Sequence, residues 1–158
     1  MAVRIFKLAL VYANQRRRST LAGVNTLRRE MEMSSRINKW DKSKYLGGVH
    51  EYKRLELAKE IDEECALKSA SWGMFQIMGF NHLYCGCKDV FEFVKKMQES
   101  HESQLKLMYY YMNNTSCLKN LKEHDWAGFA RKYNGPGYAE NAYDQKLKNA
   151  YENFKNKI

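Results

Sequence analysis

The segment from Ser71 to Gly79 sets an amide side chain among large apolar side chains and between two glycines. The amide belongs to Gln76, and Trp72 precedes it in the same segment. Glycine allows a backbone to pass close to a ligand, and the flat face of an aromatic ring can pack against a sugar ring. We therefore predict that this segment can bind a sugar, while plain core packing stays open for Trp72.

A second polar pair stands where a predicted helix ends. Tyr133 and Asn134 come directly before Gly135-Pro136-Gly137, and proline and glycine both oppose continuation of a helix. A tyrosine and an amide at a helix end can bind polar groups of a ligand. Each segment alone is a weak signal, but the two in this order, about 60 residues apart, are more specific. Tyr133 itself is either a core residue or the edge of a cleft.

The first long helix is predicted over residues 49–68. Apolar side chains recur there at steps of three and four residues, which defines one buried stripe. The members of this stripe are Tyr52, Leu55, Ala58, Ile61 and Cys65. Arg54 and Asp62 fall inside the same stripe. Two charges on a buried stripe predict a structural ion-pair or hydrogen-bond network with a shared partner. The alternative is that Asp62 is an acid facing a cleft.

The later elements are a hairpin and five more helices. Residues 69–79 suit a tight hairpin because glycines and aromatics follow in close order. Asp89 and Asp125 each precede a helical pattern that their side chains can cap. The apolar faces predicted for the five helices are Val90, Phe91, Val94 and Met97; Leu105, Met108 and Met112; Leu118 and Leu121; Trp126, Phe129, Ala130 and Tyr133; and Tyr143, Leu147, Ala150, Tyr151 and Phe154. Six helices with one hairpin-like insertion predict a mainly α fold of the α+β class.

The positive charge is concentrated in the first segment of the chain. The formal net charge is +9 over 158 residues, and residues 1–45 hold eleven lysines and arginines against three acids. A basic segment attracts polyanions such as nucleic acid, anionic lipid or anionic wall polymers, although a solvated arm is the alternative. We therefore predict a basic segment over residues 1–45 and one globular domain over residues 46–158.

Composition argues against several classes of protein. No apolar run approaches the roughly 18 residues of a membrane span. The apolar stretch Leu8–Ala13 is too short to predict a signal peptide. Cys85 and Cys87 are one residue too close for the usual zinc site, so reduced, partly buried thiols are expected, with one disulfide left open. We expect a monomer with no metal and no cofactor.

Several segments of the chain resemble known wall-degrading proteins. Residues 73–78, GMFQIM, resemble the Gly-Leu-Met-Gln-Ile segment of lytic transglycosylases and goose-type lysozymes, and residues 133–137 resemble their Tyr-Asn-x-Gly motif. The likeness is closer to the N-acetylmuramidase domain family of bacterial and phage endolysins, part of the lysozyme superfamily. That likeness rests on YKRLE at 52–56, ECALKSASWG at 64–73 and DWAGFARKYNGPGY at 125–138, and it covers roughly residues 50–156.

The resemblance implies hydrolysis of the β-1,4 bond between N-acetylmuramic acid and N-acetylglucosamine in peptidoglycan, by a bacterial or phage protein acting on the cell wall. A non-hydrolytic lytic reaction stays open. Hydrolysis needs a carboxylic acid whose pKa is raised by a partly apolar setting, so that it can protonate the leaving oxygen. The resemblance further implies that Gln76, Tyr133, Asn134 and Tyr138 bind the sugar and that Trp72 lines the groove or wedges the hairpin.

The chain departs from the family at this acid. The family places a glutamate in a Glu-Ser/Ala-Ser/Gly-Gly setting early in the domain, followed by a Phe-Glu-x-His element, and neither occurs here. Within the matching part Glu64 is the best substitute, because it lies near the end of the predicted helix beside the apolar stripe, where partial desolvation raises a carboxyl pKa. Asp62 ranks next. The alternative is that Glu64 is a solvated helix-end residue.

Three functions therefore stay open. The first is a peptidoglycan muramidase. The second is an inactive lysozyme-like module that binds glycan strands without the family glutamate. The third is a binder of nucleic acid or another anionic polymer through residues 1–45, ranked lowest because aromatics are not interleaved with its basic residues.

Overall fold

The computed structural model describes residues 4–5 and 48–157. The chain forms two compact units, residues 1–108 and residues 109–158, and the boundary falls within helix α6 (His101–Asn114). The boundary expected near residue 45, and almost all of the basic segment 1–45, lie outside the described residues.

The predicted hairpin is confirmed, and it forms the centre of a small antiparallel sheet in the first unit. The strand order is β1 (Arg4–Ile5), β2 (Ala70–Trp72) and β3 (Ile77–Met78). Ser71 of β2 lies opposite Arg4 on one side and opposite Met78 on the other. The four residues Gly73–Gln76 connect β2 to β3, so the sequence signature forms the loop of the hairpin.

The single helix predicted over residues 49–68 is wrong. The chain forms a short 3-10 turn and two helices, η2 (Gly48–His50), α3 (Glu51–Lys59) and α4 (Glu63–Ser69). Asp62 has extended backbone, and its carboxylate accepts a hydrogen bond from the Cys65 amide at 2.9 Å. A capping aspartate starts a new helix, which explains why the chain breaks here although the apolar spacing continues.

In the part of the chain that the structure describes, Arg54 binds Glu51 and Asp62 binds the Cys65 amide, and a partner shared by Arg54 and Asp62 stays a prediction. Arg54 donates a hydrogen bond to Glu51, one turn earlier on α3, with 2.7 Å between the two charged groups. The Glu51 carboxylate is fully buried. A charge is tolerated in a core when it is paired and hydrogen-bonded, so this pair is part of the packing of α3.

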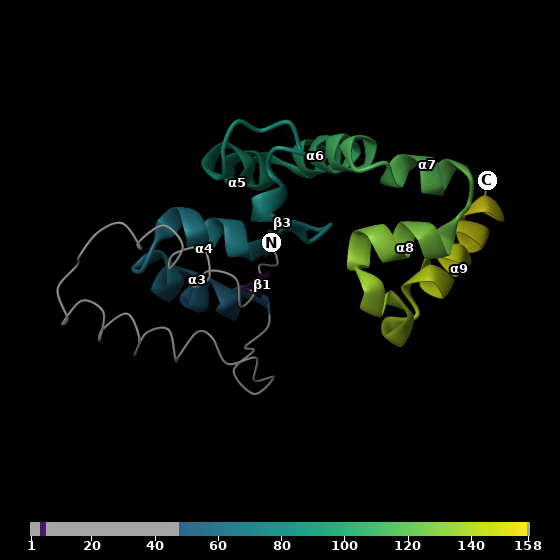
Figure 1. The fold of residues 1–158 in the computed structure, drawn as a ribbon, viewed down its shortest axis with the longest axis horizontal. Helices are drawn as coiled ribbons and strands as arrows, with labels where there is room; N and C mark the ends of the chain where they lie inside the picture. The colour runs from purple at the N-terminus through teal and green to yellow at the C-terminus, as the bar shows by residue number, and fades with distance from the viewer. Residues whose placement is uncertain (1–3, 6–47, 158) are drawn as a thin grey trace. The chain divides into compact units, whose positions relative to one another are not determined.

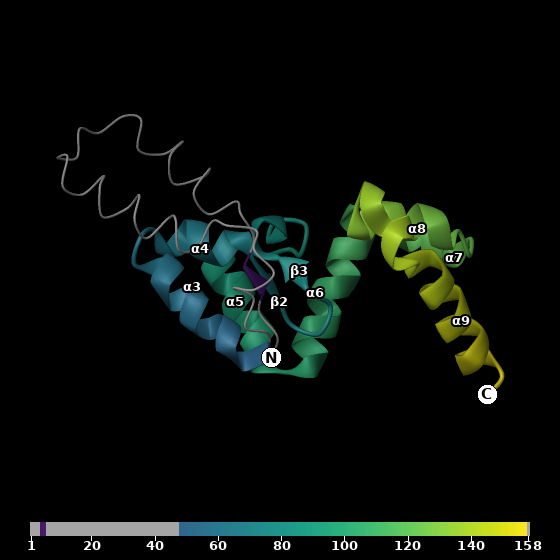
Figure 2. The ribbon, with the colours of Figure 1, turned by 90° about the horizontal axis from the view of Figure 1, so that it is seen from below.

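The core of the first unit forms around α4, which contacts α3 on one side and α5 (Val90–Glu99) on the other (Figures 1 and 2). A further 3-10 turn, η3 (Gly79–Asn81), also packs on α4. Asp89 caps α5 as predicted, accepting from the Glu92 amide at 2.8 Å. The predicted burial of Phe91 is wrong, since this side chain is 46% exposed and Phe93 is buried instead.

The second unit is a small helical cluster that includes the end of α6. In it α8 (Trp126–Asn134) contacts both α7 (Cys117–Lys122) and α9 (Tyr143–Lys155), with η4 (Pro136–Asn141) between α8 and α9 in sequence (Figure 1). Asp125 caps α8 as predicted, accepting from the Gly128 amide at 2.9 Å. The predicted stop is confirmed as well, because α8 ends at Asn134 and Gly135 has φ +86°.

Two further expectations can be compared with the described part of the chain. All four cysteines are buried free thiols, as expected. Burial raises the pKa of the Cys85 thiol to about 12, helped by the neighbouring Cys87, so this thiol stays protonated and unreactive at neutral pH. None of the helices within residues 48–157 has the length and apolar character to cross a membrane.

Candidate functional site

The signature loop is shaped from within by the amide of Gln76. This residue has φ +54°, in the left-handed region that non-glycine residues rarely adopt. Its Nε2 donates to the carbonyl oxygen of Gly73 at 2.8 Å, and its Oε1 accepts from the Ser71 hydroxyl at 2.9 Å. Each end of the amide is therefore bound inside the hairpin. Any contact from Gln76 to a sugar would use the hydrogen-bonding capacity left over.

A second amide holds the same loop from outside. Gln104, on α6, is buried with 6% of its surface exposed. Its Oε1 accepts from the backbone N–H of Met74 at 2.9 Å, and its Nε2 donates to the carbonyl oxygen of Met97 at 2.8 Å. The Met74 side chain is more than half exposed, so the tip of the loop faces solvent while its backbone is held.

Trp72 is placed in the core of the first unit. Only 1% of its surface is exposed, and its indole N–H donates to the carbonyl oxygen of Leu67 at 3.0 Å. A buried indole with a satisfied donor is typical of a packing residue. The core interpretation of Trp72 is therefore the one that the geometry favours, and an exposed face for sugar stacking is absent on this ring.

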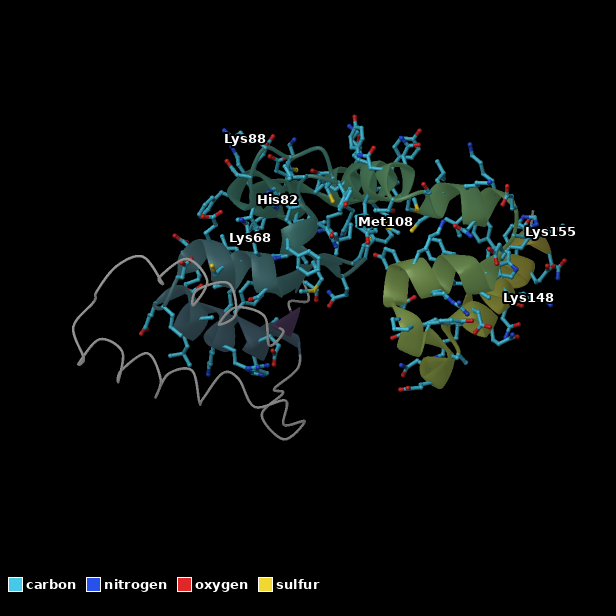
Figure 3. The ribbon with its side chains drawn as sticks, viewed as in Figure 1. Lys68, His82, Lys88, Met108, Lys148 and Lys155 are labelled. Atoms are coloured by element: carbon cyan, nitrogen blue, oxygen red, sulfur yellow. The ribbon has the colours of Figure 1, made fainter. Side chains whose placement is uncertain are left out.

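Glu64 lies in the first turn of α4, at the opposite end of that helix from the hairpin. Its carboxylate is 30% exposed and forms an ion pair with Lys68 at 2.7 Å; Figure 3 shows Lys68 on the same helix. A general acid has to reach the leaving oxygen of the substrate, and this carboxylate is engaged in an ion pair on its own helix. Asp62 is half-buried and is occupied as the cap of α4.

A groove that the sequence did not indicate lies between α3, α4 and α5 in the first unit. Its volume is about 270 Å³, and its lining includes Tyr52, Phe91 and Trp72. Two exposed carboxylates, Glu56 and Glu63, also line it, and Lys59 reaches them at 3.4 and 3.3 Å. Because Lys59 and Lys95 balance these two acids, the groove presents no excess of either charge.

The second signature stands at the end of α8 in the other unit. Tyr133 is half-buried, with its ring stacked on Phe129 at 5.4 Å and packed edge-on against Tyr111 at 5.7 Å. Asn134 is exposed as the last residue of α8. Tyr138 is half-buried, and the Arg131 guanidinium lies 5.9 Å from its ring centre. The ring of Tyr133 therefore packs in the unit, whereas the Asn134 amide is available to a ligand.

A buried amide also positions α8. The Asn120 Nδ2 donates to the Asp125 carboxylate at 2.7 Å, and the Lys132 ammonium donates to the Asn120 Oδ1 at 2.8 Å. The hydrogen bond from the Gly128 amide and then that from Asn120 hold the pKa of Asp125 below its usual value. This network links α7 to both ends of α8 and was not predicted, because it joins two different helices and depends on how they pack.

The predicted site residues fall into two groups. Asp62, Glu64, Trp72 and Gln76 belong to residues 1–108. The remaining three, Tyr133, Asn134 and Tyr138, belong to residues 109–158. Within the first unit, the hairpin follows the C-terminal end of α4, and Glu64 lies in the first turn at the N-terminal end of that helix. That both groups line a single groove stays a prediction.

Comparisons with known proteins bear on the whole chain. The model of the Muramidase family, described as N-acetylmuramidase, matches residues 10–155. The chain is similar to the crystal structure of the Burkholderia AP3 phage endolysin, with a TM-score of 0.77 and 32% sequence identity. That match covers 98% of this chain and 56% of the endolysin, so this chain spans little more than half of its length. No match is found among curated proteins.

These findings confirm the resemblance seen in the sequence. The endolysin match also confirms the mainly α, α+β lysozyme-like fold class. The family match begins 40 residues before residue 50, where the motif-based likeness began, so it includes most of residues 1–45.

Proposed function

This chain belongs to the N-acetylmuramidase family, and on that premise we propose that it hydrolyses peptidoglycan at the β-1,4 bond between N-acetylmuramic acid and N-acetylglucosamine. The observation that supports this most is the family match, which contains both signature segments. The proposed substrate is the glycan strand of a bacterial wall, and the proposed source is a bacterium or a phage. The match covers 56% of the endolysin, so the activity of that longer protein is not carried over as a whole. The activity proposed is that of the present chain.

The proposed division of labour follows from the chemistry of glycoside cleavage. One carboxylic acid protonates the leaving oxygen, while neighbouring polar groups hold the sugar rings in place. In the first unit, the loop Gly73–Gln76 is proposed to contact the sugar. Glu64, and after it Asp62, are the acids proposed from the sequence. In the other unit Asn134 and Tyr138 offer polar groups beside Tyr133.

The test uses purified bacterial walls and measures the release of reducing sugar ends. Wild-type protein should release them, and Glu64→Gln should abolish the release while leaving the fold intact. Glu63→Gln is the matched control, because Glu63 is the neighbouring acid in the same helical turn and is more exposed. Release by Glu64→Gln at the wild-type rate would remove Glu64 as the acid, and no release by wild type would refute hydrolysis by this chain.

A second candidate function is favoured by one feature of the structure. Both proposed acids serve the helix that carries them, Glu64 through its ion pair with Lys68 and Asp62 through its cap. A chain whose family glutamate is missing and whose substitutes are so engaged would bind glycan strands without cleaving them. Wall binding with release of neither reducing ends nor soluble glycan fragments would establish this function in place of hydrolysis or of a lytic reaction. A third function, binding of nucleic acid or another anionic polymer through residues 1–45, has its own test. The affinity for such a polymer would then fall steeply as the salt concentration rises.

A further inference from the structure

We propose that Gln104 is a positioning residue for the glycan-contacting loop Gly73–Gln76, an inference that rests on the proposed function. Gln104 stands 30 residues after Met74 in the sequence. Among the hydrogen bonds of the described residues, its bond to the loop is the one that it accepts from the backbone N–H of Met74. It therefore acts on a ligand through the loop and not by direct contact.

The first argument is the chemistry of a buried amide. Removing an amide from water is unfavourable unless both of its ends find hydrogen-bond partners. A leucine or methionine would fill the same space without that cost. Gln104 avoids the cost only because the N–H of Met74 and the carbonyl oxygen of Met97 stand at 2.9 and 2.8 Å. The position thus ties the hairpin loop to the end of α5 through α6.

The second argument is how closely the loop is seated. A Cβ added to Gly73 would lie 2.7 Å from the Gln104 Oε1 and 2.9 Å from the Met97 sulfur. The backbone at Gly73 therefore lies against Gln104 and Met97 with no space for a further carbon atom. The same Oε1 of Gln104 accepts the hydrogen bond from the N–H of Met74. The loop is thus both packed against Gln104 and hydrogen-bonded to it.

The third argument is what the loop presents. The Gln76 amide shapes the loop from inside, while Met74 exposes 53% of its surface at the tip. A displacement of about 1 Å in groups that hold a substrate can cost up to about a hundredfold in rate. A loop of four residues with strained backbone at Gln76 needs an outside anchor to keep one conformation, and Gln104 supplies it.

The experiment compares two variants of the full chain. Gln104→Met keeps the volume and removes both hydrogen bonds. Gln104→Glu keeps the shape: its protonated form can accept from Met74 and donate to Met97, whereas its ionised form sets an oxygen against the Met97 carbonyl oxygen. Burial favours the protonated form, so this variant should regain function at about pH 5 relative to about pH 8. Gln145→Met, at an exposed glutamine of α9, is the matched control.

Two readouts separate the proposal from general destabilisation. Hydrogen exchange of the Met74 amide should accelerate about tenfold in Gln104→Met, as expected for one lost hydrogen bond. Affinity for purified walls, measured by depletion, should fall about tenfold at unchanged helix content. All affinities are expressed relative to wild type at the same pH. On this scale Gln104→Glu should bind walls like wild type at about pH 5 and like Gln104→Met at about pH 8.

The outcomes are distinguishable. Faster Met74 exchange with unchanged wall affinity overturns the positioning role, and so does unchanged exchange. Absence of wall binding by wild type overturns the proposed function, and the positioning role with it, even though Met74 exchange in Gln104→Met would still accelerate. If Gln104→Met does not fold, Gln104→Glu decides. Its wall affinity, divided by that of wild type at the same pH, is compared at about pH 5 and about pH 8. Equal values at both pH values overturn the proposal.

Discussion

Replacing Trp72 by phenylalanine removes one ring of a side chain that is almost wholly buried in the first unit. The indole N–H donates to the Leu67 carbonyl oxygen at 3.0 Å, so the variant loses that hydrogen bond as well as packing atoms. If Trp72 serves the core, the free energy of unfolding should fall while the affinity for walls stays close to that of wild type. If Trp72 served as a sugar platform, the affinity would fall first.

The magnitude follows from the contacts of the indole. A net hydrogen bond contributes about 1 kcal/mol. The missing ring leaves a cavity of at most about 40 Å³, which costs about 1 kcal/mol at ~24 cal/mol per Å³. The lost transfer of the removed atoms adds roughly 1 kcal/mol. Trp72→Phe should therefore destabilise the protein by about 2–4 kcal/mol, a large part of the 5–15 kcal/mol that is typical of a folded domain.

The assay is urea unfolding followed by circular dichroism, because fluorescence would lose one of its own reporters. Trp126→Phe is the control: this indole is half-buried in the second unit, beside His124 and Tyr151, and its loss should cost about 1 kcal/mol. Equal midpoints for Trp72→Phe and wild type would refute the core argument. A stable Trp72→Phe that no longer binds walls would refute it as well.

Three further predictions concern other contacts. Gly73→Ala should destabilise by about 1–3 kcal/mol in urea unfolding, because a Cβ at φ +71° is strained and also meets buried neighbours. Arg54→Met should cost about 1–3 kcal/mol by the same assay, since it removes one charged hydrogen-bond partner of the fully buried Glu51 carboxylate. For Asp125, the N–H of Gly128 and then the Asn120 amide hold the folded-state pKa below the unfolded value of about 4. The stabilisation is therefore present above about pH 4 and is lost as the pH falls through the lower folded value. Asp125→Asn should thus narrow the gap in melting temperature between about pH 7 and about pH 3.

Matched substitutions separate these causes from side effects. Gly135→Ala also places a Cβ at positive φ (+86°) but meets nothing within 4 Å, so its cost measures backbone strain alone. Lys106→Met removes an exposed ion pair to Glu102 at 2.9 Å and should change stability by less than about 0.5 kcal/mol. A Gly73→Ala variant as stable as wild type would contradict both the strain and the crowding at Gly73. The melting temperature of Asp125→Asn could instead differ between about pH 7 and about pH 3 by as much as that of wild type. That result would contradict the role of the ionised Asp125 carboxylate as a helix cap.

Local features of the sequence predicted most of the described secondary structure. The caps at Asp89 and Asp125, the stop at Gly135 and the hairpin over residues 69–79 all depend on neighbours in the chain, so a local pattern is enough to place them. The break at Asp62 is also local, but the continuing apolar spacing concealed it. The fold class and the family followed from motifs that residues 50–156 hold in order.

The tertiary structure alone decided which partners the polar side chains of Gln104 and Asn120 bind. Nothing near Gln104 in the sequence indicates that it holds the backbone of Met74, and nothing near Asn120 indicates its bond to Lys132. Likewise, periodicity indicated a buried face of α5 but could not choose Phe93 over Phe91. These outcomes depend on partners brought together by packing. A hydrogen bond or a filled cavity is a property of the folded neighbourhood, and the sequence spacing of one element does not contain it.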